Sequence, residues 1–222
     1  MITAWEVAVQ ALFVHGMGRS PISGWPLLWH LRRAGLKPRS FGYLVSLEDF
    51  AAIERRLAAK IARLASREDY VLIGHSLGGV LIRAAVNSLP DATRRPRHIF
   101  LLGSPHRASR LAQRLGRNPV YRLLTRDCGQ LLGSTQRMAA VGAVGVPTTS
   151  IAGVAGPQRY FTAFPGEPND GVVSLSEVSA HWIGDQVQVP LIHTVLPMST
   201  SVALTILERL AFDRRSISAD PG

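Results

Sequence analysis

Short apolar runs alternate along this chain with longer segments in which apolar residues recur every three or four positions. The short runs are typical of buried strands, and the longer segments of helices with one buried face. We expect strands at residues 6–14, 37–43, 70–74, 98–102, 148–154 and 187–192. We expect helices at residues 21–34, 47–65, 76–89 and 198–212.

Strands and helices therefore follow one another in turn, which predicts an α/β fold with a mostly parallel sheet and helices on both faces. At 222 residues the chain has the length of one domain, spanning 1–222. Residues 106–145 interrupt the alternation and are expected to form a small helical cap, and residues 216–222 a tail. In such folds, ligands bind at the carboxyl ends of the strands.

The net charge of +10 raises nucleic acid or an anionic membrane as partners. Nearly all the cations are arginine, and alanine and glycine are plentiful, which a GC-rich genome alone would produce. No basic strand carries the aromatic residues of an RNA-binding sheet, so no nucleic-acid partner is expected. The alternative, a nucleic-acid-binding protein, rests on charge alone. Salt-dependent binding of DNA or RNA without serine reactivity would favour it.

Few features of the sequence bear on the compartment in which the protein works. Cys128 is the one cysteine, which excludes an internal disulfide. No apolar run reaches the length of a membrane span, and the first residues lack a basic signal-peptide region. We expect a cytoplasmic protein, or one peripheral to a membrane.

The strongest motif is Gly-His-Ser-Leu-Gly at residues 74–78. An apolar run precedes it and a helical pattern follows, which is the setting of a serine nucleophile on a tight strand-to-helix turn. The motif alone also fits an ordinary glycine-rich turn with Ser76 as a helix N-cap. With this context we assign Ser76 as the nucleophile.

A serine nucleophile needs a base, and the base needs an acid that fixes its tautomer. Asp170, in the turn Asn-Asp-Gly before a buried apolar pair, is the chosen acid, although this sequence also fits a plain turn. The other acids after the serine are Asp91, Asp127, Glu177 and Asp185. For the base, His193 follows the last expected strand, whereas His181 precedes it, so His193 is chosen.

An oxyanion hole needs two N–H groups. Leu77 follows the nucleophile, and Met17 lies between two glycines in the loop after the first expected strand, so these two residues are assigned. His15, His75 and His106 are expected to brace the site or line its pocket. Trp25 and Val173, with Met17 and Leu77, are candidates for an apolar pocket that suits an acyl chain.

In order and spacing, these motifs resemble those of α/β-hydrolases of the lipase and esterase kind. The matching segments are residues 14–18, 74–79, 103–109, 169–173 and 192–193. The resemblance extends from Val7 to about Leu210, and it implies the same triad and the same oxyanion donors. The chain would begin at the third strand of the full fold, so it implies a short sheet of about six strands.

The expected cap carries seven arginines against a single acid, Asp127. Its first four arginines fall at helical spacing, with leucines and alanines on a neighbouring face: Arg107, Arg110, Arg114 and Arg117. We expect one short basic amphipathic helix over the mouth of the site. This helix would meet an anionic membrane or substrate, or its arginines would form an ordinary solvated face.

The sequence thus predicts hydrolysis of a carboxylic ester, with a small molecule or lipid as substrate and no cofactor or metal ion. Acyl transfer and thioester hydrolysis use the same triad and remain alternatives. A non-catalytic binding protein of the same fold would lack a triad member.

Overall fold

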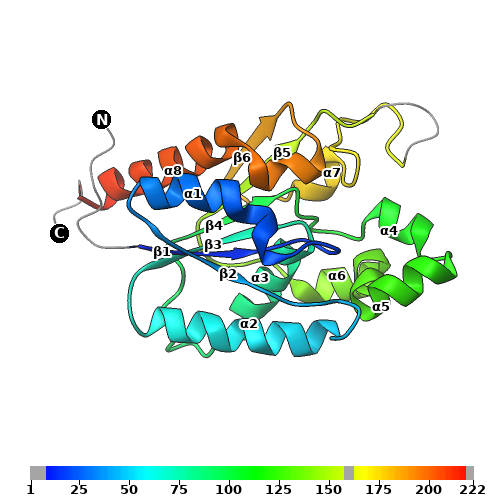
Figure 1. The fold of residues 1–222 in the computed structure, drawn as a ribbon, viewed down its shortest axis with the longest axis horizontal. Coiled ribbons are helices and arrows are strands. Elements are labelled where there is room, and N and C mark those ends of the chain that lie inside the picture. Colours follow the sequence, from blue (N-terminus) through cyan, green and yellow to red (C-terminus); the bar gives the residue numbers. More distant parts are fainter. Residues whose placement is uncertain (1–8, 158–162, 219–222) are drawn as a thin grey trace.

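One parallel sheet of six strands organises the molecule, in the order β2-β1-β3-β4-β5-β6 (Figure 1). This computed structural model describes residues 9–157 and 163–218. The strands are β1 (Gln10–Val14), β2 (Lys37–Phe41), β3 (Tyr70–His75), β4 (His98–Leu102), β5 (Thr148–Gly153) and β6 (Asp185–Val189). All five pairings are parallel, which confirms the predicted sheet.

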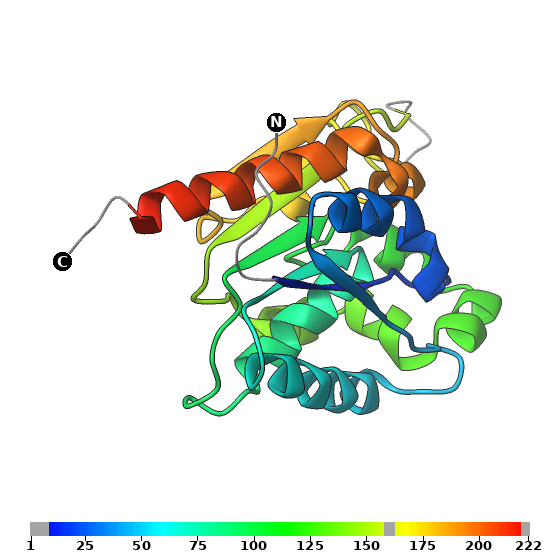
Figure 2. The same ribbon diagram turned by 60° about the vertical axis from the view of Figure 1, so that its left-hand side comes forward.

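Helices cover both faces of the sheet, as Figure 2 shows. Helices α1 (Trp25–Arg33) and α8 (Thr200–Ser218) lie on one face, and α2 (Phe50–Ala65) and α3 (Leu77–Asn87) on the other. Successive residues of a strand point their side chains to opposite faces of the sheet. In β1, Leu12 packs with α2 and α3, whereas Phe13 packs with α1 and α8.

Helix α2 shows how sequence produces an element here. Ile53, Leu57 and Ile61 repeat at helical spacing and are fully buried against the sheet. The Asp49 side chain accepts a hydrogen bond from the N–H of Ala52 and so caps the first turn. The helix therefore begins at Phe50, whereas the sequence pattern had predicted a start at residue 47.

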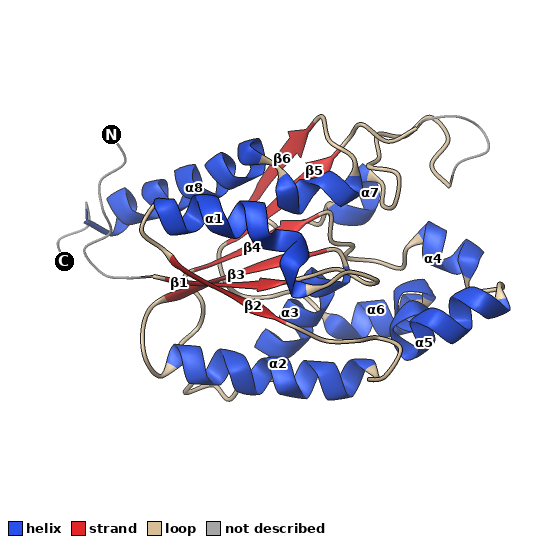
Figure 3. Ribbon diagram, in the orientation of Figure 1, coloured by secondary structure: helices blue, strands red, loops and turns tan. Residues whose placement is uncertain are grey.

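The insertion folds into three helices, α4 (Arg110–Leu115), α5 (Pro119–Gly133) and α6 (Thr135–Val141). Figure 3 shows them beyond the carboxyl ends of the strands. The predicted helical cap is therefore present, and it stands at the edge where the candidate site residues gather.

Several predicted boundaries are wrong for local reasons. The first helix is split into the 3-10 turn η1 (Pro21–Gly24) and α1, whose first turn contains Pro26, a residue that favours the start of a helix. The last strand ends at Val189, and not at residue 192, because Pro190 has no N–H to donate to the sheet.

Three further differences concern helices. α7 (Leu175–Val178) and the 3-10 turn η2 (His193–Met198) were not predicted. Helix α8 begins at Thr200 rather than at residue 198, and it extends to Ser218, so it includes the first three residues of the expected tail. Residues 6–8 of the first expected strand and 219–222 of the tail lie outside the described residues. Across residues 9–157 and 163–218, no helix is long and apolar enough to cross a membrane.

Candidate active site

Ser76 occupies the turn between β3 and α3 in a conformation that few residues adopt. Its backbone has φ 55° and ψ −124°, and its N–H donates a 2.9 Å hydrogen bond to the carbonyl oxygen of Leu102 in β4. Positive φ is strained for a residue with a Cβ, and such strain concentrates at functional sites. The turn holds the serine at the carboxyl edge of the sheet, where it is half-buried.

Close backbone packing keeps this turn tight. A Cβ on Gly78 would collide with the carbonyl oxygens of Val14 and His15, so α3 can approach β1 only with glycine at that position. Leu77 is the first residue of α3, and the first N–H groups of a helix have no partner inside the helix. The N–H assigned to the oxyanion hole therefore lies directly after the serine.

Asp170 and His193 form a buried pair. The distance from His193 Nδ1 to Asp170 Oδ2 is 2.6 Å, and both side chains are almost fully buried. The backbone joins the same two residues, since the His193 N–H donates to the Asp170 carbonyl oxygen at 2.9 Å. A carboxylate at Nδ1 requires that nitrogen to carry the proton, which leaves Nε2 as the lone-pair nitrogen.

The turn at residues 169–173 fixes the Asp170 carboxylate. Asp170 Oδ1 accepts hydrogen bonds from the N–H groups of Val172 (2.9 Å) and Val173 (2.8 Å), which leaves Oδ2 for the histidine. Asn169 in turn accepts from the Gly171 N–H at 2.9 Å and donates to the carbonyl of Glu167. Each carboxylate oxygen thus has defined partners, and the imidazole is oriented by the second.

His75 links the serine turn to the histidine. Its Nε2 lies 3.0 Å from the carbonyl oxygen of His193, and the two rings are 4.7 Å apart. A bond to a carbonyl requires a proton on Nε2. Burial, with His193 next in effect, keeps the pKa of His75 well below its usual value, so the ring is neutral. The residue next to Ser76 in sequence therefore contacts His193 directly.

The loop after β1 lies against the nucleophile. A Cβ on Gly16 would lie 3.0 Å from the Cβ of Ser76, which places the backbone just before Met17 beside the serine. His15 braces this loop as expected, since its Nδ1 is 2.9 Å from the Gly16 carbonyl and its ring stacks on Tyr43 at 4.2 Å. Burial lowers the His15 pKa.

The other acid candidates are engaged or placed elsewhere. Asp127 forms a bidentate pair with Arg137, and Asp185 pairs with Arg209. Glu177 accepts from the N–H of Arg110 at 2.7 Å. Asp91 is exposed after α3, where it pairs with Arg95. His181 is exposed before β6.

The two pocket candidates are placed differently from each other. Trp25 is 63% exposed at the start of α1, a helix that packs against η2. Val173 is buried in a small cluster with Ala152 and Val178, and its N–H is one of the two that hold Asp170. The structure thus adds a part for Val173 in fixing the acid, which the sequence pattern did not reveal.

The four arginines expected in one helix do not share one. Arg107 precedes the N-cap Ser109, and Arg117 follows the C-cap Gly116, so α4 contains only two of them. Arg110 turns inward, where it contacts Glu167, Ser174 and the buried Glu177. The predicted helix of outward-facing arginines is wrong in this respect, because acids outside the insertion pair with Arg110.

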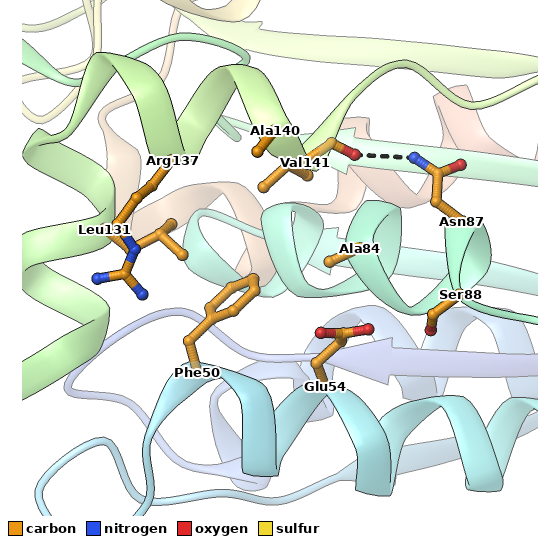
Figure 4. Close-up of a pocket in the computed structure, with 9 residues that line it drawn as sticks. All are labelled: Phe50, Glu54, Ala84, Asn87, Ser88, Leu131, Arg137, Ala140 and Val141. Atoms are coloured by element: carbon orange, nitrogen blue, oxygen red, sulfur yellow. Dashed lines mark hydrogen bonds between the residues drawn. The ribbon is translucent and has the colours of Figure 1, made fainter.

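Side chains of α3 anchor the cap. Asn87 Nδ2 donates to the carbonyl oxygens of Val141 (2.8 Å) and Ala143 (2.9 Å). Figure 4 shows the first of these bonds at the end of a cavity of about 430 Å³ between α2, α3 and α6. Arg83, almost fully buried, donates to the carbonyls of Gly142 and Pro105, and burial lowers its pKa to about 10. No pattern in the sequence indicated these anchors, since arginine is the ordinary cation throughout the chain.

A comparison with protein families identifies the family of this chain. The family described as Alpha/beta hydrolase family matches residues 11–210. The chain belongs to this family. A comparison with curated proteins finds no match.

Solved structures with the same fold include a lipase, a carboxyl esterase and a thioesterase. The mature lipase BlEst2 of Bacillus licheniformis is 16% identical, with a TM-score of 0.69, and the match covers 94% of each chain. The metagenomic carboxyl esterase MGS0156 is 15% identical, with a TM-score of 0.72 over 96% of this chain and 77% of the other. The RedJ thioesterase of Streptomyces coelicolor is 15% identical, with a TM-score of 0.57 over 94% and 91%. At these identities the likeness shows the shared fold.

Proposed function

We propose that this chain hydrolyses carboxylic esters through an acyl-enzyme formed on Ser76. The observation that carries the proposal is Ser76 at positive φ on its turn, directly after His75, whose ring lies 4.7 Å from the His193 ring. His193 in turn forms the buried pair with Asp170. In this mechanism Ser76 Oγ attacks the acyl carbonyl while His193 Nε2 takes its proton, and the proton then passes to the leaving alcohol. Water, activated by the same nitrogen, releases the acid.

The other groups at the edge stabilise charge and geometry. The N–H groups of Met17 and Leu77 donate to the oxyanion of the tetrahedral intermediate. Asp170 holds the imidazole in the tautomer that the first step requires and stabilises the imidazolium that forms. Neutral His75 adds no repulsive charge beside that imidazolium.

Thioester hydrolysis is the second candidate, because the RedJ thioesterase shares the fold of this chain. The triad chemistry is the same for both acyl donors, and only the leaving group differs. Rates on p-nitrophenyl esters of increasing acyl length, set against the matching acyl thioesters, distinguish them. We expect higher kcat/KM on esters, and higher kcat/KM on thioesters would favour the second candidate.

Variants of the acid test the mechanism within the same assay. Asp170→Asn should lower turnover on the best ester by several orders of magnitude, because the wrong histidine tautomer is then favoured. Asp91→Asn, in an exposed loop, is the matched control and should leave turnover unchanged. An equal rate in the Asp170→Asn variant would contradict the assigned role of this carboxylate.

A further inference from the structure

The first half of α5 presents aliphatic side chains to solvent. Val120 is 61% exposed, Leu123 74% and Leu124 60%. Across a groove of about 490 Å³ lies Leu47, which is 73% exposed, in the segment before α2. Soluble proteins scatter exposed leucines singly, whereas a gathered apolar patch marks a contact surface. We call these four residues the α5 surface.

Arginines that no carboxylate neutralises accompany these aliphatic residues. Arg117 and Arg122 are exposed, and within the described residues neither forms an ion pair. The Arg126 guanidinium donates to the Ser46 carbonyl oxygen at 2.8 Å, which ties α5 to the segment that holds Leu47.

The acids near this groove are all engaged. Asp127 is held by Arg137, and Glu48 pairs with Arg56. Asp49 caps α2 through the Ala52 N–H. Asp49 keeps its negative charge as an N-cap. In the described part of the chain, three arginines without an ion pair therefore stand against one such acid around the α5 surface, so positive charge dominates there.

We propose that the α5 surface docks on an anionic phospholipid bilayer. Aliphatic side chains enter the boundary between headgroups and acyl chains, and neighbouring arginines bind the phosphates. Protein interfaces concentrate aromatic residues at their core, whereas the exposed side chains here are leucine and valine. The surface lies on the cap, at the carboxyl edge where Ser76 stands, so docking would bring that edge toward the lipid (Figure 1).

The docking residues differ from those that the sequence indicated. Arg110 contacts Glu167 and Glu177, so it has no free charge to offer to lipid headgroups. Arg117 is the member of the expected set that lies next to the α5 surface, and Arg122 and Arg126 join it.

The test is co-sedimentation of the full chain with vesicles of phosphatidylcholine and phosphatidylglycerol. The Ser76→Ala variant is measured as well, so that binding is scored independently of catalysis and of the proposed function. We expect binding to anionic vesicles that weakens as salt rises, because salt screens surface charge. Absence of binding to anionic vesicles at low salt would overturn the proposal.

Two double variants separate the apolar and charged contributions. Leu123→Ser with Leu124→Ser, and Arg117→Gln with Arg122→Gln, should each weaken binding about tenfold or more. Only the arginine variant should reduce the salt dependence. The matched control is Leu204→Ser with Arg67→Gln, which changes a half-exposed leucine of α8 and an exposed arginine after α2.

Two results would contradict docking on lipid. The first is an equal loss of binding in the control variant. The second is self-association of the native chain in the absence of vesicles, measured by sedimentation velocity and abolished by Leu123→Ser with Leu124→Ser. That result would assign the α5 surface to contact between two copies of the chain.

Discussion

At Ser76 the chain accepts a backbone conformation that costs on the order of 1–3 kcal/mol. Contacts on both sides over-determine it, through the bond from the Ser76 N–H to Leu102 and the packing of Gly78 against β1. The motif was visible in the sequence because turn, strand and helix are consecutive there. His193 was found from its place after the last expected strand and Asp170 from its turn before a buried apolar pair, and the structure brings the two side chains within 2.6 Å of each other.

Gly103 packs closely against Asp170 and His193, which the sequence could not reveal. It follows β4 at φ 52°, and a Cβ there would lie 2.8 Å from Asp170 Oδ2 and 3.0 Å from His193 Nδ1. The contact joins three segments that are distant in sequence, so no local pattern records it. The end of the expected strand at residue 102 indicated a nearby site, but it did not show which residues Gly103 contacts.

Gly103→Ala should therefore lower kcat by at least tenfold, because the added methyl group displaces the carboxylate or the imidazole and φ is unfavourable for alanine. The measurement is kcat on a p-nitrophenyl ester, with circular dichroism to verify folding. Gly145→Ala is the control, since a Cβ there meets open space and φ is not positive. Unchanged kcat in a folded Gly103→Ala variant would contradict the close packing described here.

At the scale of elements, strands and long helices followed from apolar periodicity, whereas the arrangement of the arginines in the cap did not. The sequence showed arginines at helical spacing, but which of them face solvent depends on acids outside the insertion. Burial opposes ionisation of Glu167, yet hydrogen bonds from Ser176 and Arg110 hold its pKa at about 2. Helix α4 is thereby tied to the segment that precedes Asp170.

Arg110→Gln should loosen this connection by about 1–3 kcal/mol, because buried Glu177 loses a charge-assisted partner. Hydrogen exchange of the amides of α4 should speed up, while that of β3 and β4 changes little. Arg107→Gln, which alters an exposed arginine before the N-cap, is the comparison. Equal exchange of α4 in the two variants would show that Arg110 does not anchor it.

At the scale of the whole molecule, three histidines make stability depend on pH, of which His15 and His75 are buried and His106 is partly buried. Burial is the largest cause that lowers the pKa of His15, His75 and His106, in the last case to about 3. In the unfolded chain each has a pKa near 6.5. The unfolded state therefore binds more protons below pH 6.5, and the stability present above this pH is lost as pH falls.

The free energy of unfolding should fall by about 1.4 kcal/mol per pH unit for each histidine that is protonated only in the unfolded state. Urea unfolding at several pH values between 7 and 4 measures this slope. His106→Gln should reduce the slope by about one proton, whereas His181→Gln, at an exposed position, should not. The same slope in all three proteins would show that His106 takes up a proton while folded.

Covalent labelling of the reactive serine tests most directly whether Ser76 is the nucleophile. The full chain is treated with a fluorophosphonate, and the modified peptide is located by mass spectrometry. We expect a single adduct on Ser76, absent from a folded Ser76→Ala variant and much slower to form in Asp170→Asn. An adduct on another serine, or none on a folded native chain, would contradict it.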